Sequence, residues 1–447
     1  MDYFQRKDTH DPEKAPPLNP PAGDLPSEEA RRLAKGRRIL GWFIFLVCGI
    51  LLFNSRVRVT ERDLTPARQD SGQPWYCSQS AIWEKTPHCE GRDRDEASFR
   101  VTQPIELPLN AGDILTLSSW GLPEPFGGTL DISQTADAGS NQTLVDIEVL
   151  YPAGGADVIR DVSALRVCST NPVKGEWRLN IFSSDWFEPN VRLKMHVRLP
   201  AAQCHSPLKL KALTANLANF DLRLHDLATC AHFEAIDIMT TNGSIHADAL
   251  AADTISLATD NKPIHGTYNT TKSLLLKTTN AEIAVRANLF NDASPGGRPT
   301  TVHMHTTNAI LDSQIGLYSS AHGRSGGNFL TIVRTSNAPL VLSFLDHPVD
   351  GRLQAAVRTT NKNAAVSLHP AFEGSFAVRT SNASPEVEYD DAVEDPAGEG
   401  RKRRFDLQHH TESYLRGRVH WGDNDEEKEK EGRVTVTTTN AVVKVEL

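Results

Sequence analysis

The sequence predicts a mainly β protein with a single N-terminal transmembrane helix, a β-sandwich-like domain and then a β-solenoid of about nine coils. Three observations support this fold class. An uncharged apolar run covers residues 39–53, short stretches between residues 99 and 206 alternate apolar and polar residues, and a Thr-Thr-Asn motif recurs from residue 207 onward. Alternation with a period of two is typical of strands, and a repeat of ~20–30 residues carried by short strands is typical of a solenoid.

The composition narrows the possible functions before any motif is considered. The 447 residues include 47 basic and 56 acidic side chains, and the resulting net charge of −9 argues against a nucleic-acid partner. A hydrophobic share of 39% allows a sizeable core and excludes a polytopic membrane protein. Six Cys are too few for a disulfide scaffold. No His-Glu-x-x-His string is present, and we expect no catalytic residue, metal or cofactor.

The first 55 residues predict a membrane anchor. Residues 1–38 are polar and rich in Pro, as in a disordered cytoplasmic tail. The run 39–53 would rise about 22 Å as a helix, short of the ~30 Å hydrocarbon core, and Asn54 and Ser55 extend the span to residues 39–55. A cleaved signal peptide and a buried helix are the alternatives. Five basic residues within residues 31–38 place the N-terminus in the cytosol, and the bulk of the chain outside the cell or in the secretory lumen.

Two segments separate the anchor from the repeats. Residues 56–98 are polar and charged, which indicates a stalk. Residues 99–206 form the expected β-sandwich-like domain, because strand-like stretches are separated there by clusters of Gly, Pro and Asn. The clearest strand covers residues 191–199, where Arg, Lys and His alternate with apolar residues.

The cysteines beyond the anchor allow two disulfides in an oxidising compartment. Proximity in the sequence favours Cys77 with Cys89 and Cys168 with Cys204. The alternative is that these cysteines are small buried side chains.

Four N-glycosylation sequons lie on the same side of the anchor. We expect glycans on Asn141 and Asn269. Asn242 and Asn382 are themselves part of the repeat and are expected to face neighbouring coils.

The repeat reads apolar, x, apolar, x, Thr, Thr/Ser, Asn, small, x, apolar. Its clear copies are centred on Asn242, Asn280, Asn308, Asn337, Asn361, Asn382 and Asn440, and weaker copies on Asn216 and Asn261. Each copy predicts two strands around a Thr-Asn corner. Asn tolerates the left-handed conformation at such a corner, and its amide can bond local backbone or form a ladder with Asn of the next coil. The motif is therefore structural, and the coils of residues 207–447 would stack into one core.

Residues 386–431 interrupt the repeats. They are charged and poor in apolar residues, which predicts a loop inserted between coils. Within them, Arg401-Lys-Arg-Arg404 matches a site for a secretory dibasic protease, and a solvated charge run is the alternative.

A second set of positions lies three residues before the Asn and is basic in five copies: Lys277, His305, Arg334, Arg358 and Arg379. Stacking would align these side chains in a row on one face. The row could bind an anionic polymer, or it could be a solvated face that discourages edge association.

The repeated Thr-Thr-Asn-Ala/Gly between alternating apolar residues resembles the "putative adhesin" repeat family, over about residues 207–447. The resemblance implies a right-handed β-solenoid and no catalytic residues. Together with the anchor, the layout resembles single-pass membrane proteins of filamentous and basidiomycete fungi.

The sequence therefore favours a non-enzymatic, membrane-anchored surface or lumenal protein whose solenoid acts as an adhesion, spacer or polymer-binding module. Its expected partners are the membrane and a cell-wall polysaccharide or surface protein. The alternative is a carbohydrate-active enzyme of the secretory pathway or cell surface. Such an enzyme needs paired carboxylates in a cleft, whereas the repeat positions carry Thr and Asn.

Overall fold

The computed structural model describes residues 77, 79–85, 96–101, 103–122, 126–135, 142–152, 165–183, 191–200, 207–294, 296–422 and 432–447. All of them belong to one unit, Tyr76–Leu447. The predicted tail (1–38), the anchor (39–55) and most of the stalk (56–98) lie outside the described residues. Within the described ranges, no helix is long and apolar enough to cross a membrane.

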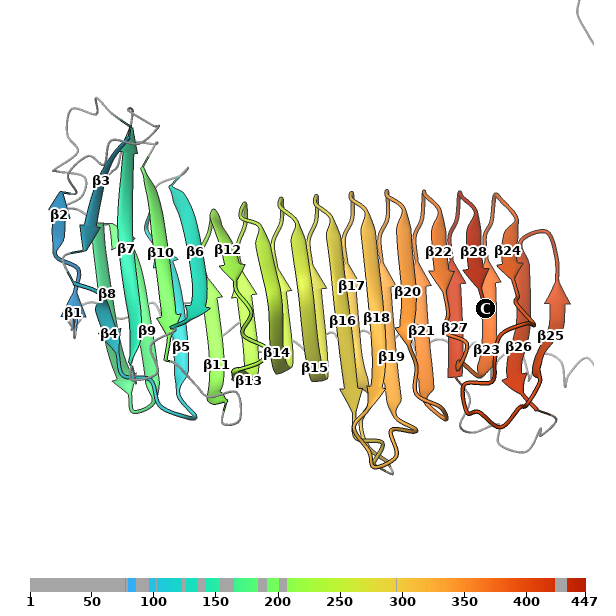
Figure 1. Cartoon of the computed structure of the whole chain (residues 1–447). Coiled ribbons are helices and arrows are strands. Elements are labelled where there is room, and N and C mark those ends of the chain that lie inside the picture. Colours follow the sequence, from blue (N-terminus) through green and yellow to red (C-terminus); the bar gives the residue numbers. More distant parts are fainter. Residues whose placement is uncertain are drawn as a thin grey trace, which may run out of the picture. The chain divides into compact units, whose positions relative to one another are not determined.

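The described part is mainly β, as the sequence predicts, and its 28 strands form one hydrogen-bonded sheet (Figure 1). The first ten strands are β1 (Gln79–Ser80), β2 (Trp83–Lys85), β3 (Glu96–Val101), β4 (Ile105–Leu107), β5 (Ile114–Trp120), β6 (Gly127–Gln134), β7 (Thr143–Pro152), β8 (Leu165–Val173), β9 (Glu176–Ser183) and β10 (Arg192–Leu199). The remaining strands belong to the repeats and to the segment that interrupts them.

The first ten strands mix antiparallel and parallel pairs. β7 runs antiparallel to β3, β4 and β10, whereas β6 runs parallel to β10 and β5 runs parallel to β9. The repeats continue from this part without a break, because their first two strands pair in parallel with β5 and β6. The expected β-sandwich-like domain at 99–206 thus shares its sheet and its hydrophobic core with the repeats.

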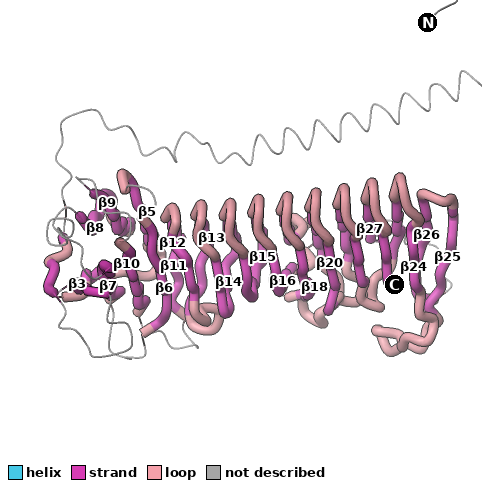
Figure 2. Tube along the Cα trace, turned by 90° about the horizontal axis from the view of Figure 1, so that it is seen from above, coloured by secondary structure: helices cyan, strands magenta, loops and turns pink. Residues whose placement is uncertain are grey.

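The repeats form two rows of parallel strands. The leading row contains the strands that precede each Asn corner: β11 (Leu208–Asn216), β13 (Ala231–Met239), the second halves of β14 (Ile245–Ala258) and β15 (Ile264–Lys277), then β17 (Thr300–His305), β19 (Asn328–Arg334), β21 (Arg352–Arg358), β27 (Gly432–Thr437) and β23 (Gly374–Arg379). The trailing row contains the strands that follow: β12 (Phe220–Leu224), the first halves of β14 and β15, then β16 (Ile283–Asn291), β18 (Leu311–Ser319), β20 (Leu340–Asp346), β22 (Ala364–Ser367), β28 (Val443–Glu446) and β24 (Pro385–Glu388). Figure 2 shows the turns following one another along the stack.

We call one leading strand, its corner and its trailing strand a rung. The residue four before the corner Asn points inward in every rung and is at most 1% exposed: Ala215, Ile238, Leu257, Leu276, Met304, Val333, Val357, Val436 and Val378. Burial of such a side chain contributes roughly 1.5–3 kcal/mol relative to leaving it exposed. Because a single rung cannot bury this face alone, stacking creates the core.

The order of the last rungs in space differs from their order in the chain. β27 pairs with β21 on one side and with β23 on the other, and β28 likewise lies between β22 and β24. The C-terminal rung is therefore inserted between two rungs that precede it in the sequence (Figure 1). The rungs therefore do not stack in chain order at this end.

The segment 386–431 is also not a simple loop. It contains a hairpin, β25 (Arg403–His410) and β26 (Tyr414–Trp421), and β26 runs antiparallel to β23. The hairpin therefore covers the strand edge that the last rung would otherwise leave unpaired. The sequence did not predict these strands because their apolar content is low. The last five of the eight side chains of β25 are exposed.

Candidate functional site

The corners of the rungs are joined by a ladder of Asn side chains. Each Asn after the first donates from its amide nitrogen Nδ2 to Oδ1 of the preceding one at 2.6–2.8 Å, in the order Asn219, Asn242, Asn261, Asn280, Asn308, Asn337, Asn361, Asn440 and Asn382. The ladder follows the spatial order of the rungs, so Asn440 lies between Asn361 and Asn382. These amides face neighbouring rungs but lie on exposed turns.

The first member of the ladder is Asn219 and not Asn216, on which we centred the weak copy of the motif. Asn219 has a φ of 61°, the left-handed conformation that Asn tolerates, and its Nδ2 donates to the backbone oxygen of Phe126 at 3.3 Å. Asn216 is the exposed last residue of β11. The weak copy was centred on Asn216 instead of Asn219 because the first rung lacks the Thr-Thr pair that marks the other copies.

The Thr two residues before each Asn has a role that the sequence alone did not reveal. Its hydroxyl is buried and donates to the backbone oxygen of the residue after the corner Asn in the neighbouring rung. The donors are Thr240, Thr259, Thr278, Thr306, Thr335, Thr359, Thr438 and Thr380. Each corner is therefore tied to the next by an exposed amide and a buried hydroxyl.

The five basic side chains of the repeat lie on the outer face of the leading row. Lys277 is paired in register with His305, His305 with Arg334, and Arg334 with Arg358, and all four are exposed. Arg379 follows after an interruption by Thr437, which the inserted strand β27 places between Arg358 and Arg379. The structure thus brings together every residue of the predicted basic row.

Little in the described part of the chain neutralises this basic row. No described carboxylate forms an ion pair with Lys277, Arg334, Arg358 or Arg379. Partial burial and the neighbouring charges of Lys277 and Arg334 lower the pKa of His305. Among the described residues, Lys277, Arg334, Arg358 and Arg379 therefore form a positive strip without ion-pair partners, on a protein of negative net charge.

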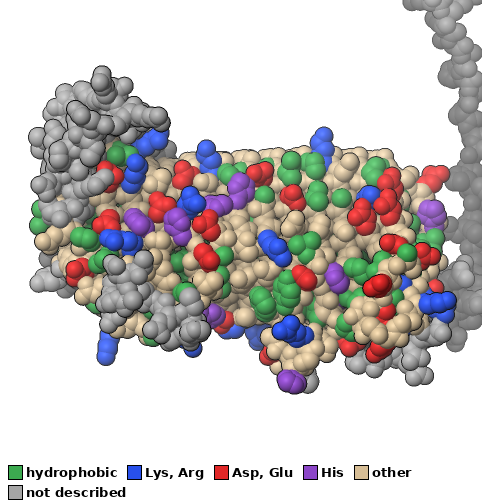
Figure 3. All heavy atoms as spheres, viewed as in Figure 1, with side chains coloured by type: hydrophobic (Ala, Val, Ile, Leu, Met, Phe, Trp, Pro, Cys, Tyr) green, Lys and Arg blue, Asp and Glu red, His purple; other side chains and the backbone are tan. Residues whose placement is uncertain are grey.

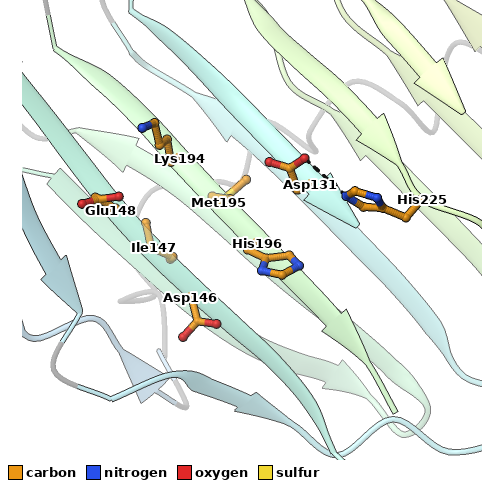
Figure 4. A pocket seen from close by; sticks show the side chains of 8 residues that line it. All are labelled: Asp131, Asp146, Ile147, Glu148, Lys194, Met195, His196 and His225. Atoms are coloured by element: carbon orange, nitrogen blue, oxygen red, sulfur yellow. Dashed lines mark ion pairs between the residues drawn. The ribbon is translucent and has the colours of Figure 1, made fainter. Parts of the chain in front are cut away.

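A second polar region lies on the trailing face, where β6, β7 and β10 meet β12. Its centre is a shallow hollow of about 380 Å³ (Figure 4), lined by Asp131, Asp146, Ile147, Glu148, Lys194, Met195, His196 and His225. Figure 3 shows His and acidic side chains interleaved over this end of the face. Sequence reasoning missed the hollow. Alternation over residues 191–199 indicates which of their side chains share a face, but not which carboxylates on other strands lie opposite them.

Two carboxylates of the hollow lie beside basic side chains. His225 lies between two carboxylates, with Nε2 3.7 Å from Asp131 Oδ1 and Nδ1 3.5 Å from Asp248 Oδ2. Arg198 pairs with Asp146 at 2.6 Å. Within the described ranges, no group of three or more His, Cys, Asp or Glu side chains is arranged to hold a metal ion. Asp131 and Asp146 of the hollow thus lie beside His225 and Arg198, respectively.

The predicted disulfides are wrong. Cys77 is bonded to Cys168, because β1 runs antiparallel to β8 and pairs Ser80 with Cys168 in register. Cys230 is also disulfide-bonded. Cys89 and Cys204 lie outside the described residues. Proximity in the sequence failed as a guide, since the sheet joins cysteines that are 91 residues apart.

The structure describes one of the two expected glycan sites, Asn269. Asn141 lies outside the described residues. Asn269 is half-buried within β15, and its Oδ1 accepts a hydrogen bond from Asn288 Nδ2 at 2.7 Å. A glycan on Asn269 stays a prediction.

The basic run Arg401–Arg404 is held by the fold. Arg401 Nη2 pairs with Asp395 at 2.9 Å, and Arg403 is 7% exposed with its guanidinium over the rings of Tyr389 and Trp421. A processing protease needs an accessible, extended segment, so this packing favours a structural role for the run.

Comparison with known proteins places the chain near no described family. No family model and no curated protein matches it. A cell adhesion protein of Clostridium sporogenes, described as "putative", aligns at 8% identity and a TM-score of 0.14, over 77% of this chain and 99% of that one. A "putative adhesin" of Bacteroides fragilis aligns at 5% identity and 0.24, over 79% and 98%, and one of Parabacteroides merdae at 7% and 0.20, over 62% and 92%. Likeness at this level carries no conclusion about function.

Proposed function

We propose that the protein is a non-enzymatic, membrane-anchored surface or lumenal protein. In this proposal the two rows form a right-handed β-solenoid of about nine coils, which acts as an adhesion, spacer or polymer-binding module. The single observation that carries the proposal is the basic row. Lys277, His305, Arg334 and Arg358 follow one another along one face and Arg379 lies beyond Thr437, in a part of the fold whose corners are held by two kinds of hydrogen-bond ladder.

A regular stack is suited to binding along its length. Each rung repeats the same side-chain positions at the strand spacing of about 4.8 Å, so a weak contact made once per rung is multiplied along the row. The membrane anchor would hold this surface at the cell surface or in the secretory lumen, facing cell-wall polysaccharides or surface proteins.

The test is retention of cell-wall polysaccharides by the full chain. We expect binding without release of sugar products, and membrane association that survives high-salt washing. Polysaccharide cleavage would contradict the non-enzymatic role and favour the carbohydrate-active alternative, for which the hollow around Asp131 and Asp146 is the place to search. Against that alternative, Asp146 is ion-paired with Arg198, whereas a general acid must be held protonated.

A further inference from the structure

We infer that the leading face binds a linear polyuronate, a polysaccharide with one carboxylate per sugar, laid along the stack and across the strands. The inference rests on the proposed polymer-binding function and names the class of ligand. Its first support is the spacing of the basic row. Register pairs place the five basic residues and Thr437 on consecutive strands, so the row from Lys277 to Arg379 spans five steps of about 4.8 Å, or about 24 Å.

This spacing distinguishes between polyanions. A pyranose ring is similar in length to the rung spacing of about 4.8 Å, so a polyuronate carries about one carboxylate per rung, and those on its protein-facing side can meet the row. Duplex DNA carries one charge per ~1.7 Å, which leaves most of its phosphates without a partner on this face, whereas a single strand, with one charge per ~3.4 Å, lies closer to the interval of the row. Arg binds carboxylates through two parallel hydrogen bonds, and three of the five members are Arg.

The surface on either side of the row is the second support. Two residues before each of the five basic positions and before Thr437, the strands carry six side chains without a carboxylate and without Phe, Tyr or Trp. They are Leu275, His303, Ile332, Ala356, Thr435 and Ala377. Proteins bind single-stranded nucleic acids by stacking the bases on aromatic side chains, and these six residues include no Phe, Tyr or Trp. They form a mostly aliphatic surface on which the apolar face of a sugar ring can lie.

On the other side of the row lie the corners. Two residues after each of the five basic positions and after Thr437, the chain carries a hydroxyl: Thr279, Thr307, Ser336, Thr360, Thr439 and Ser381. All of them are exposed or half-buried. Cations flanked by hydroxyls suit a ligand that carries both carboxylates and hydroxyls, which is the chemistry of a uronic acid.

The inserted C-terminal strand provides a test through gain of function. Thr437 occupies the one position of the row that is not basic, between Arg358 and Arg379. Thr437→Arg would complete the row. A matched control is Arg352→Ser, which removes an exposed Arg from the same strand as Arg358, six residues or about 20 Å from the row.

The experiment titrates the full chain, in a non-ionic detergent at low salt, against a labelled oligogalacturonate long enough to span the row. We expect the double variant Arg334→Ser/Arg358→Ser to lose at least about tenfold in affinity. Arg352→Ser should stay within about twofold of the unmodified protein, and Thr437→Arg should bind about two- to fivefold more tightly. Equal urea midpoints for all variants would show that the fold is unchanged.

Three results would overturn the inference in distinguishable ways. Heparin or single-stranded DNA binding as tightly as the polyuronate at matched charge would reduce the row to a general polyanion surface. Binding of a neutral glucan, unaffected by Arg334→Ser/Arg358→Ser, would refute the basic row and leave the proposed polymer-binding function standing. Failure to retain any glycan, charged or neutral, would contradict both.

Discussion

At the scale of the residue, each corner depends on two side chains with different surroundings. The corner Asn amides are exposed, so water can replace their hydrogen bonds, whereas the Thr hydroxyls are buried, so water cannot. Loss of a buried partner is the more costly change, because it leaves a polar group unsatisfied. The Asn ladder could be predicted from the residue type at a tight corner, but the Thr bond could not, since its acceptor is a carbonyl of another rung.

We expect Thr259→Val to destabilise the protein by about 1–2 kcal/mol, because the Gly243 carbonyl loses the hydroxyl that donates to it at 2.8 Å. The matched control is Thr331→Val. Thr331 is equally buried and its hydroxyl has no hydrogen-bond partner among the described residues, so this change should be neutral or stabilising. Urea unfolding monitored by circular dichroism compares the two. Equal losses would show that the Thr hydrogen bonds do not hold the corners.

His347 should make stability depend on pH. Burial lowers its pKa to about 4 from the ordinary value of 6.5, so the folded chain keeps the ring neutral while the unfolded chain takes up a proton. Stability should therefore fall as the pH decreases from 6.5 to 4, by about 3 kcal/mol over the window. His347→Phe should flatten this dependence in urea titrations at several pH values, and the exposed His322→Asn should not. The same slope in all three proteins would refute this role.

At the scale of the element, the strand types were predictable and their partners were not. Alternation identifies a strand such as residues 191–199, and the apolar residue four before each Asn identifies the inward face. The insertion of β27 and β28, the hairpin β25–β26 and the Cys77–Cys168 bond all depend on which distant segments meet. These features depend on pairing between strands that are distant in the sequence, and local periodicity gives no information about such pairing.

Engineered disulfides can test the inserted rung. Ala356 is paired in register with Thr435, and Thr435 with Ala377, so Ala356 and Ala377 are two strands apart. Cysteines at Ala356 and Thr435 lie within bridging range at about 4.8 Å between strands, whereas cysteines at Ala356 and Ala377 lie about 9.6 Å apart. We expect mild oxidation to cross-link only the first pair, detected by peptide mapping. Cross-linking of the second pair alone would show that the rungs stack in chain order.

At the scale of the whole molecule, a negative net charge coexists with a positive strip on the leading face. The trailing face carries paired acids and histidines, while the leading face aligns five basic residues along the rungs. The alignment of these side chains follows from the sequence, since a fixed offset from the repeat Asn specifies both the strand face and the position along it. The interruption at Thr437 could not be predicted, because it follows from the insertion of the last rung.

The account's central claim is that the rungs act together to bind one extended anionic chain. The most direct test is a titration of the full chain with oligogalacturonates of increasing length. We expect the affinity to rise with each added sugar until the oligomer spans the row of about 24 Å, and then to level off. Affinity that is the same for a single galacturonate and for a chain longer than the row would contradict it.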